Sequence, residues 1–453
     1  MAGEHWPLPR SVYVVKIALY TIFRCTNYGA VLQAYALARI LRGILGEDAV
    51  DVINHRMDPR DNHLLGKITN PNTPWFQRWR NKRKFAVRYS HPELFERRRA
   101  KTIRLIEKFI RPTDRLYKNP KELRGLPPYD TVVVGSDQIW NPSLNHDFGY
   151  NQYLGTDLPD KQDRVAYAAS FGVSELPEEC RDEYRAALSK FRIITVREES
   201  GVKICRNLLS ANGDSPQGSD GDSPQGLARG DSPQVVLDPT LLLTADDWRM
   251  MVGTDPDGAK GTVPDRSKGT VPKGVPDKSM GTAPDRAMGA DPKGASGRYL
   301  AAYWVRTLTE ADVAALARIA RDGAAPICLM SAGPLPKFRF PPEVAPYIDA
   351  DPFDFVRTLS GATAVVTDSF HGLQFATLFK KPFLVLGNIS DPKSNASRLV
   401  DFCARYGLSG GIQDIEAFRA GVERPFADAA RFDAKALDAD RVRSLAALKG
   451  MLP

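Results

Sequence analysis

His371 is the histidine whose sequence context best fits a role in chemistry. It belongs to the stretch VVTDSFHGLQFATLF (365–379), in which an apolar strand pattern runs into a helix predicted to begin near Gly372. Such junctions lie on the ligand-binding edge of a parallel sheet, and a helix N-terminus attracts anions. A bound anion would favour protonation of His371, which predicts an acid–base role for it, with Ser369 beside it as an anion ligand. The alternative is a histidine that only caps the helix or packs beneath the loop.

Two basic residues are candidates for holding an anionic substrate. Arg197 follows a predicted strand at 193–196 in IITVREESG, and a guanidinium can hold two oxygens of a carboxylate or phosphate at once. Its alternative role is a structural ion pair with Glu198, Glu199 or another acid. Lys393, in the segment DPK, follows the predicted strand at 383–386 and offers a mobile charge to a phosphate. An ordinary surface lysine is the alternative there.

A polar and aromatic segment, GSDQIWNP (135–142), follows the predicted strand at 131–134. Planar polar groups beside an aromatic ring suit a sugar, whose hydroxyls need hydrogen bonds and whose C–H faces stack on rings. We expect acceptor contacts from its side chains Ser136, Asp137, Gln138, Trp140 and Asn141. The alternative is a turn held by the polar side chains, with the tryptophan in the core. The loop at Asn27 and Gly29 is a further candidate for contact with the acceptor or an anion.

Common cofactor and metal motifs are missing from the sequence. The loop after the first strand matches neither GxGxxG nor GxxxxGK[ST], and no HExxH, paired CxxC or EF-hand pattern occurs. We therefore expect no metal, dinucleotide or nucleoside triphosphate site. The five cysteines are scattered, which fits a reducing cytosol rather than a disulfide framework. With no secretory signal and no membrane-spanning run, a cytoplasmic protein is expected.

The chain is basic, with a formal net charge of +8, which favours anionic partners without choosing among them. A dense basic region with interleaved aromatic residues lies between Arg78 and Arg104. It is a candidate for peripheral contact with an anionic membrane or for binding a pyrophosphate-linked acceptor; a solvated helix face is the alternative. Because no nucleic-acid reading motif accompanies the charge, nucleic acid is not an expected partner.

The elements that would position these residues alternate between short apolar strands and amphipathic helices. A helix face is predicted from the spacing of Leu37, Ile40, Leu41 and Ile44, and a second helix at 311–321. Strands are predicted at 14–20, 131–134, 165–169, 193–196, 235–237, 299–304, 327–330, 364–367 and 383–386. This pattern predicts two doubly wound, Rossmann-like α/β domains that face one another across a cleft.

Two low-complexity segments interrupt this pattern. Gly-Asp-Ser-Pro-Gln units recur within 212–234, and Gly-Thr-x-Pro-Asp-like units recur within 253–297. Their Gly, Pro, Ser, Asp and Lys content cannot bury enough apolar surface to offset chain entropy, so they are interpreted as insertions. The predicted organisation is an N-terminal domain at 1–211, on the acceptor side, and a C-terminal domain at 235–453, on the donor side.

Six segments in this order resemble the polysaccharide pyruvyltransferase family: NYGAVLQAYAL, GSDQIWNP, YAASFG, VREESG, VLDPTLLL and TDSFHGLQFATLFKKPF. The resemblance spans about residues 14–405, apart from the two insertions. It implies a fold similar to GT-B glycosyltransferases, phosphoenolpyruvate as donor, and a glycan hydroxyl pair, free or carried on a lipid, as acceptor. The implied product is a cyclic pyruvate ketal for surface or exopolysaccharide biosynthesis, formed without a metal or organic cofactor.

The resemblance also implies roles for individual residues. His371 resembles the acid–base histidine of the family, Arg197 its donor-binding arginine, and Lys393 a basic residue that helps to hold the donor phosphate. Many relatives have Arg-Leu-His where this chain has Ser369-Phe370-His371, so a donor contact made through that arginine is either absent or supplied elsewhere.

Two other functions remain open from the residues alone. A GT-B-type glycosyltransferase would use the same arginine and lysine to grip the pyrophosphate of a nucleotide sugar. A non-enzymatic glycan-binding scaffold would not need His371 for its function.

Overall fold

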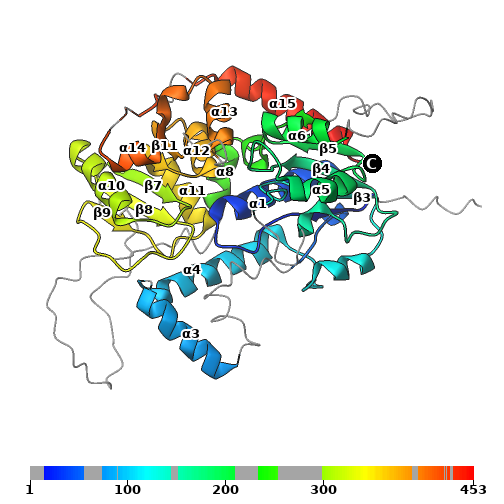
Figure 1. The fold of residues 1–453 in the computed structure, drawn as a ribbon, viewed down its shortest axis with the longest axis horizontal. Helices are drawn as coiled ribbons and strands as arrows, with labels where there is room; N and C mark the ends of the chain where they lie inside the picture. Colours follow the sequence, from blue (N-terminus) through cyan, green and yellow to red (C-terminus); the bar gives the residue numbers. More distant parts are fainter. Residues whose placement is uncertain are drawn as a thin grey trace, which may run out of the picture.

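The structure, a computed structural model, contains two parallel sheets of six strands each (Figure 1). This confirms the predicted two-domain α/β fold. The described residues are 15–55, 74–88, 90–143, 151–209, 233–253, 298–389, 396–422, 424, 426–428 and 432–453. Most of the two predicted insertions and all of DPK (391–393) lie outside these residues.

The first sheet has the strand order β2-β1-β3-β4-β5-β6. Its strands are β1 (Ile17–Tyr20), β2 (Val50–Val52), β3 (Thr131–Val134), β4 (Arg164–Ala169), β5 (Ile193–Val196) and β6 (Gln234–Val235). The inner strands are fully buried, as expected for a parallel sheet covered on both faces. The order reverses between β1 and β3, and ligands of open α/β sheets bind at such a switch point, beyond the carboxyl ends of the strands.

The second sheet has the order β12-β11-β10-β7-β8-β9, so its switch point lies between β7 and β10. Its strands are β7 (Leu300–Trp304), β8 (Ile327–Ser331), β9 (Val344–Pro346), β10 (Ala364–Thr367), β11 (Phe383–Gly387) and β12 (Ile412–Asp414). All nine predicted strands are present within a few residues. The strands that the sequence did not predict, β2, β9 and β12, are short and lie at sheet edges.

Helices connect the strands and carry several of the candidate residues. The principal helices are α1 (Tyr28–Leu45), α3 (Trp75–Arg88), α4 (Pro92–Leu105), α5 (Arg181–Leu188), α6 (Glu199–Leu209), α7 (Pro239–Leu242), α8 (Ala245–Gly253), α10 (Glu310–Asp322), α11 (Pro352–Gly361), α12 (Phe370–Leu378), α13 (Ser397–Arg405), α14 (Ile415–Arg419) and α15 (Ala434–Gly450). The α12 helix begins at Phe370 rather than near Gly372, because the Ser369 side chain accepts the Gly372 N–H and caps it.

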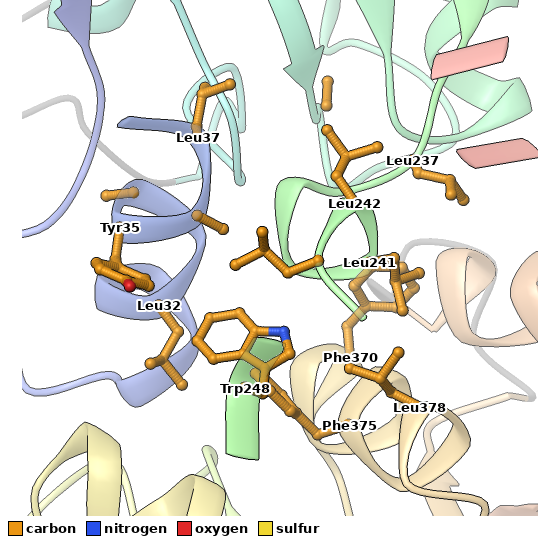
Figure 2. Packing of buried hydrophobic residues seen from close by; sticks show 14 of the residues in the cluster. Leu32, Tyr35, Leu37, Leu237, Leu241, Leu242, Trp248, Phe370, Phe375 and Leu378 are labelled. Carbon is orange, nitrogen blue, oxygen red and sulfur yellow. The ribbon is translucent and has the colours of Figure 1, made fainter. Parts of the chain in front are cut away.

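An apolar core joins the two sheets. Trp248 of α8 packs against Tyr35 of α1 and Phe375 of α12, with ring centroids 5.9 and 5.0 Å apart (Figure 2). Tyr28, at the start of α1, packs against Tyr303 of β7 and donates its hydroxyl to the Ala350 carbonyl at 3.0 Å. These contacts hold the first turn of α1 against the second sheet.

Two features of the structure concern the predicted C-terminal domain at 235–453. Val235 ends β6, which pairs with β5 in the first sheet. The last helix, α15, also returns to the first domain, where Ser444 accepts the Leu237 N–H at 2.9 Å and Arg192 donates to the Met451 carbonyl at 2.8 Å. Parts of the C-terminal range therefore pack with the first sheet. Within the described residues, no helix is both long and apolar enough to cross a membrane.

Candidate functional site

The candidate site lies where the switch points of both sheets meet. From the first sheet come the loops after β1, β3, β5 and β6, which carry Asn27, Asp137, Arg197 and Asp238. From the second sheet comes the junction between β10 and α12, which carries His371. Because parallel strands end at the same edge of a sheet, residues far apart in sequence converge here.

Arg197 is at the centre of a buried ionic network. Its Nη1 donates to Asp238 Oδ2 at 2.7 Å and its Nη2 donates to Asp137 Oδ1 at 3.2 Å, with the arginine side chain only 1% exposed. An ion pair, the alternative role given for Arg197, is therefore present, and its partners Asp137 and Asp238 come from other loops. Glu198 instead accepts the Phe171 N–H through Oε1. Arg197 Nε has no hydrogen-bond partner among the described residues.

Asp238 connects the network to the histidine, and the sequence analysis did not single it out. Its Oδ1 accepts the backbone N–H and the hydroxyl of Thr240, at 3.0 and 2.7 Å, which fixes the carboxylate at the N-terminus of α7. Its Oδ2 accepts from Ser136 Oγ at 3.4 Å and lies 3.5 Å from His371 Nε2. The VLDPTLLL segment contains a signal for this role, since aspartate before proline is a strong helix N-cap.

His371 is buried and tightly enclosed. Among the described residues its Nε2 has no hydrogen-bond partner, although the Asp238 carboxylate is adjacent. Gly29 in α1 packs so closely that a β-carbon there would lie 2.2 Å from His371 Nδ1. Gly29 therefore serves the site by having no side chain, which is a different contribution from the acceptor contact predicted for it.

Arg398 of α13 is a second arginine in the site, and the sequence analysis missed it. Its guanidinium carbon lies 5.4 Å from the ring centroid of Phe370, and that of Arg197 lies 4.9 Å from the same ring. The Gln138 amide is within hydrogen-bond distance of the Arg398 guanidinium. Two guanidinium groups therefore meet at one aromatic ring, next to the histidine.

The buried charges of the site shift one another's pKa values. Burial, together with the charge of Arg197, lowers the pKa of Arg398 to about 10. Burial would raise the pKa of Asp137, but the charges of Arg197, His371 and Arg398 outweigh it and lower that pKa. The pKa of Asp238 is likewise lowered, because His371 and Arg197 outweigh the effect of burial. Asp137 and Asp238 therefore compensate the charge of Arg197, while Arg398 lies next to that like charge.

The remaining acceptor candidates surround this network. Asn27 caps α1, with its Oδ1 accepting the Gly29 N–H at 3.0 Å and the Tyr303 hydroxyl at 3.2 Å. Ser136 and Asp137 take part in the ionic network itself. Gln138 and Asn141 are buried, and their side-chain amides are within 2.8 Å of each other.

Trp140 occupies a position that does not fit the sugar-stacking role predicted for it. It is fully buried, its indole N–H donates to the Tyr153 carbonyl at 3.2 Å, and its ring packs against Phe171 and Phe191. No ring face is left for a ligand, so the core alternative describes this residue. Lys393 lies outside the described residues. Those residues also contain no group of three or more His, Cys, Asp or Glu side chains that could hold a metal ion.

Residues 27–390 match the family model described as polysaccharide pyruvyl transferase. No curated protein matches the chain. Similar solved structures include the glycosyltransferase SnogD from Streptomyces nogalater, at 16% identity, covering 97% of this chain and 96% of that one, with a TM-score of 0.35. The E. coli ADP-heptose lipopolysaccharide heptosyltransferase II has 14% identity, coverage of 95% and 99%, and a TM-score of 0.35. S. aureus MnaA in a UDP co-structure has 11% identity, coverage of 94% for both chains, and a TM-score of 0.44.

Proposed function

Because the chain belongs to the polysaccharide pyruvyl transferase family, we propose that it transfers the pyruvyl group of phosphoenolpyruvate to two hydroxyls of one glycan residue. The products are a cyclic pyruvate ketal and inorganic phosphate. The observation that carries the proposal is the pairing of two arginines, Arg197 and Arg398, at Phe370 beside His371. A small dianionic or trianionic donor matches this arrangement, because it brings a carboxylate and a phosphate to adjacent positive groups.

Arg398 is proposed to replace the arginine that many relatives carry in Arg-Leu-His. This chain has Ser369 at that position, and the serine hydroxyl caps α12 by accepting the Gly372 N–H. Arg398 comes from a different helix but lies against Phe370, the next residue. In the proposal Arg197 and Arg398 hold the donor anions, with Ser369, Lys393 and the N-terminus of α12 as further contacts.

The proposed reaction balances without a metal or an organic cofactor. A proton adds to the methylene carbon of phosphoenolpyruvate, and the first sugar hydroxyl attacks the central carbon as cationic character develops there. The second hydroxyl then attacks the same carbon while the C–O bond to phosphate breaks. Of the two hydroxyl protons, one ends on the new methyl group and the other on the phosphate. The arginines supply the positive charge that stabilises the anionic groups.

His371 is proposed to exchange the proton with the reacting hydroxyl, and Asp238 to position it. The Asp238 carboxylate lies 3.5 Å from His371 Nε2 and is itself fixed by Thr240. A carboxylate so close to an imidazole limits rotation of the ring. The acceptor, a glycan that can be carried on a lipid, is proposed to lie near Asn27, Ser136, Gln138 and Asn141. Because phosphoenolpyruvate is a cytoplasmic metabolite, the proposal places the reaction in the cytoplasm.

The test is phosphate release from phosphoenolpyruvate with a panel of free and lipid-linked glycan acceptors, in the presence and absence of EDTA. We expect acceptor-dependent release that EDTA leaves unchanged and that His371→Ala reduces by about 10²–10⁴-fold, the range typical for a general acid–base group. The control is His91→Asn, at the start of α4 and outside the site, which should retain activity. Absence of release with every acceptor, together with protection by a nucleotide sugar, would instead support a glycosyltransferase.

A further inference from the structure

One side of α3 exposes three large aromatic side chains. Trp75, Phe76 and Trp79 are 79%, 52% and 57% exposed. Such residues are seldom exposed together on a protein that has no partner at that surface. The helix lies apart from both sheets in Figure 1, at the lower edge of the molecule, and is joined to the body through α4.

The exposed basic residues of α3 lie on the same side of the helix as these aromatic side chains. Helical spacing places Trp75, Trp79 and Arg83 in one row and Phe76, Arg80 and Lys84 in the neighbouring row. Asn81, on another side of the helix, is buried. We refer to these two rows as the α3 face. Arg83 lies over the Trp79 ring, with its guanidinium carbon 5.0 Å from the centroid.

The charge on α3 has one sign. Every ionisable residue of the helix is Arg or Lys, and no Asp or Glu occurs between Trp75 and Arg88. A second copy of the same face would be repelled, because each copy brings the same positive charge. An anionic surface would be attracted, and exposed aromatic rings beside basic side chains are the composition of helices that lie in the membrane interface.

The α4 helix, which contacts α3, is bonded to loops beside the candidate site. Arg98 of α4 is buried and donates to the carbonyls of Thr26, Ser331 and Ala332. Thr26 directly precedes Asn27, the cap of α1, and Ser331 ends β8. Lys101, one turn further on, donates to the Asp349 carbonyl at 3.0 Å. The helix that supports the α3 face is thus bonded to loops of both domains at the edge of the site.

We propose that the α3 face docks on the surface of an anionic lipid bilayer. The aromatic rings enter the interfacial region, and Arg80, Arg83 and Lys84 contact lipid phosphates. In the part of this inference that rests on the proposed function, docking holds the acceptor side of the site near the membrane, where lipid-linked glycans are found. The docking itself does not depend on the reaction.

The experiment is co-sedimentation of the full chain with phosphatidylcholine vesicles, with and without phosphatidylglycerol, at low and high ionic strength. Three variants are compared: W75A/F76A/W79A, R80Q/R83Q/K84Q, and the control K203Q/R206Q/K449Q, which removes the same charge from exposed positions on α6 and α15. We expect the wild type and the control to bind phosphatidylglycerol vesicles. Each α3 variant should lose at least about tenfold in affinity, and high salt should weaken binding.

Three outcomes would overturn the proposal. The first is equal binding of the wild type to both kinds of vesicle. The second is an equal loss of vesicle binding in the control variant. The third is that the aromatic variant loses self-association, measured by sedimentation velocity, and keeps its vesicle binding. Phosphate release with a water-soluble acceptor should be unchanged in the α3 variants. Vesicle binding is measured without phosphoenolpyruvate, so the two proposals are tested separately. The chain can release phosphate without binding vesicles, or bind vesicles without releasing phosphate.

Discussion

Two regions of the molecule combine arginine with aromatic rings, and they differ in how the charge is compensated. In the site, Arg197 is buried against Phe370 and held by two carboxylates. On α3, Arg83 lies on Trp79 in a helix without any acidic residue. A buried charge requires fixed partners, so each member of its network is individually important. Exposed charges attract a partner through their total charge, so replacing any one of them has a small effect on binding and stability.

Removal of Asp238 should have the largest effect on stability. In Asp238→Ala the Arg197 guanidinium remains buried but loses the shorter of its two ion pairs. We expect this loss to lower the free energy of unfolding by about 3–5 kcal/mol. Urea denaturation would measure this change. The control is Asp246→Ala, which removes an exposed ion pair with Arg249 on α8 and should cost about 1 kcal/mol or less. Equal losses in the two variants would contradict the contrast between buried and exposed charge.

A methyl group at Gly29 should displace His371. A β-carbon there would lie 2.2 Å from Nδ1, so Gly29→Ala is expected to reduce the rate of phosphate release about 10²-fold, as does a misplacement of about 1 Å in other active sites. Gly43→Ala, in the same helix, adds a methyl group with no atom within 4 Å and should leave the rate unchanged. A normal rate in Gly29→Ala would show that the histidine can move without loss of activity.

Loss of Arg398 should affect donor binding. Arg398→Gln removes one of the two guanidinium groups at Phe370, and we expect the KM for phosphoenolpyruvate to rise about 10- to 100-fold, corresponding to a charged hydrogen bond of about 1.5–3 kcal/mol. Steady-state kinetics at saturating acceptor would show this. Arg405→Gln, on the same helix and ion-paired with Asp440, is the control that should leave KM unchanged. An unchanged KM in Arg398→Gln would leave Arg197 as the main donor contact.

The contribution of Asp137 should depend on pH. Its pKa is lowered from the ordinary value of 3.8 because Arg197, His371 and Arg398 outweigh burial, so its stabilising effect is present above pH 3.8 and is lost as the pH falls through the folded-state pKa. The difference in unfolding free energy between the wild type and Asp137→Asn should therefore shrink below pH 3.8, by at most about 1.4 kcal/mol per pH unit. A constant difference would mean that this ion pair adds no pH-dependent stability.

Single substitutions on the α3 face should have the smallest effects. Arg80→Gln and Arg83→Gln are each expected to weaken vesicle binding by about fivefold, corresponding to about 1 kcal/mol per charge, and to change unfolding by less than about 0.5 kcal/mol. Similar effects of the two variants would support action through the sum of charges. A much larger loss in one of them would indicate a specific site.

The sequence predicted elements best where local pattern and burial agree. The predicted bounds of β3, β5 and β10 match the structure, because each is a short apolar run that ends at a polar loop. The edge strands β2, β9 and β12 have three residues each, too few to produce a periodic signal. Their existence depends on pairing with strands that are already in place.

The site was predicted in part, and the missing parts depend on tertiary contacts. The positions of Arg197 and His371 could be inferred because Arg197 directly follows β5 and His371 lies at the junction between β10 and α12. Arg398 could not, since it lies within a helix and reaches the site only because α13 packs beside Phe370. For Trp140 the local sequence allowed both a sugar platform and a core residue; Phe171 and Phe191, which arrive from other segments, place it in the core.

The return of α15 to the first domain affects how the two domains can move. The chain passes between them once after β6 and again before α15, so two covalent connections join the same pair of bodies. Two connections oppose twisting and sliding, and leave rotation about the line through both of them as the motion of lowest cost. Asp238, in the loop that follows β6, lies close to the first connection, and residues further from the axis travel further. Such a rotation leaves the Asp238–Arg197 pair intact while it moves more distant residues of one domain against the other.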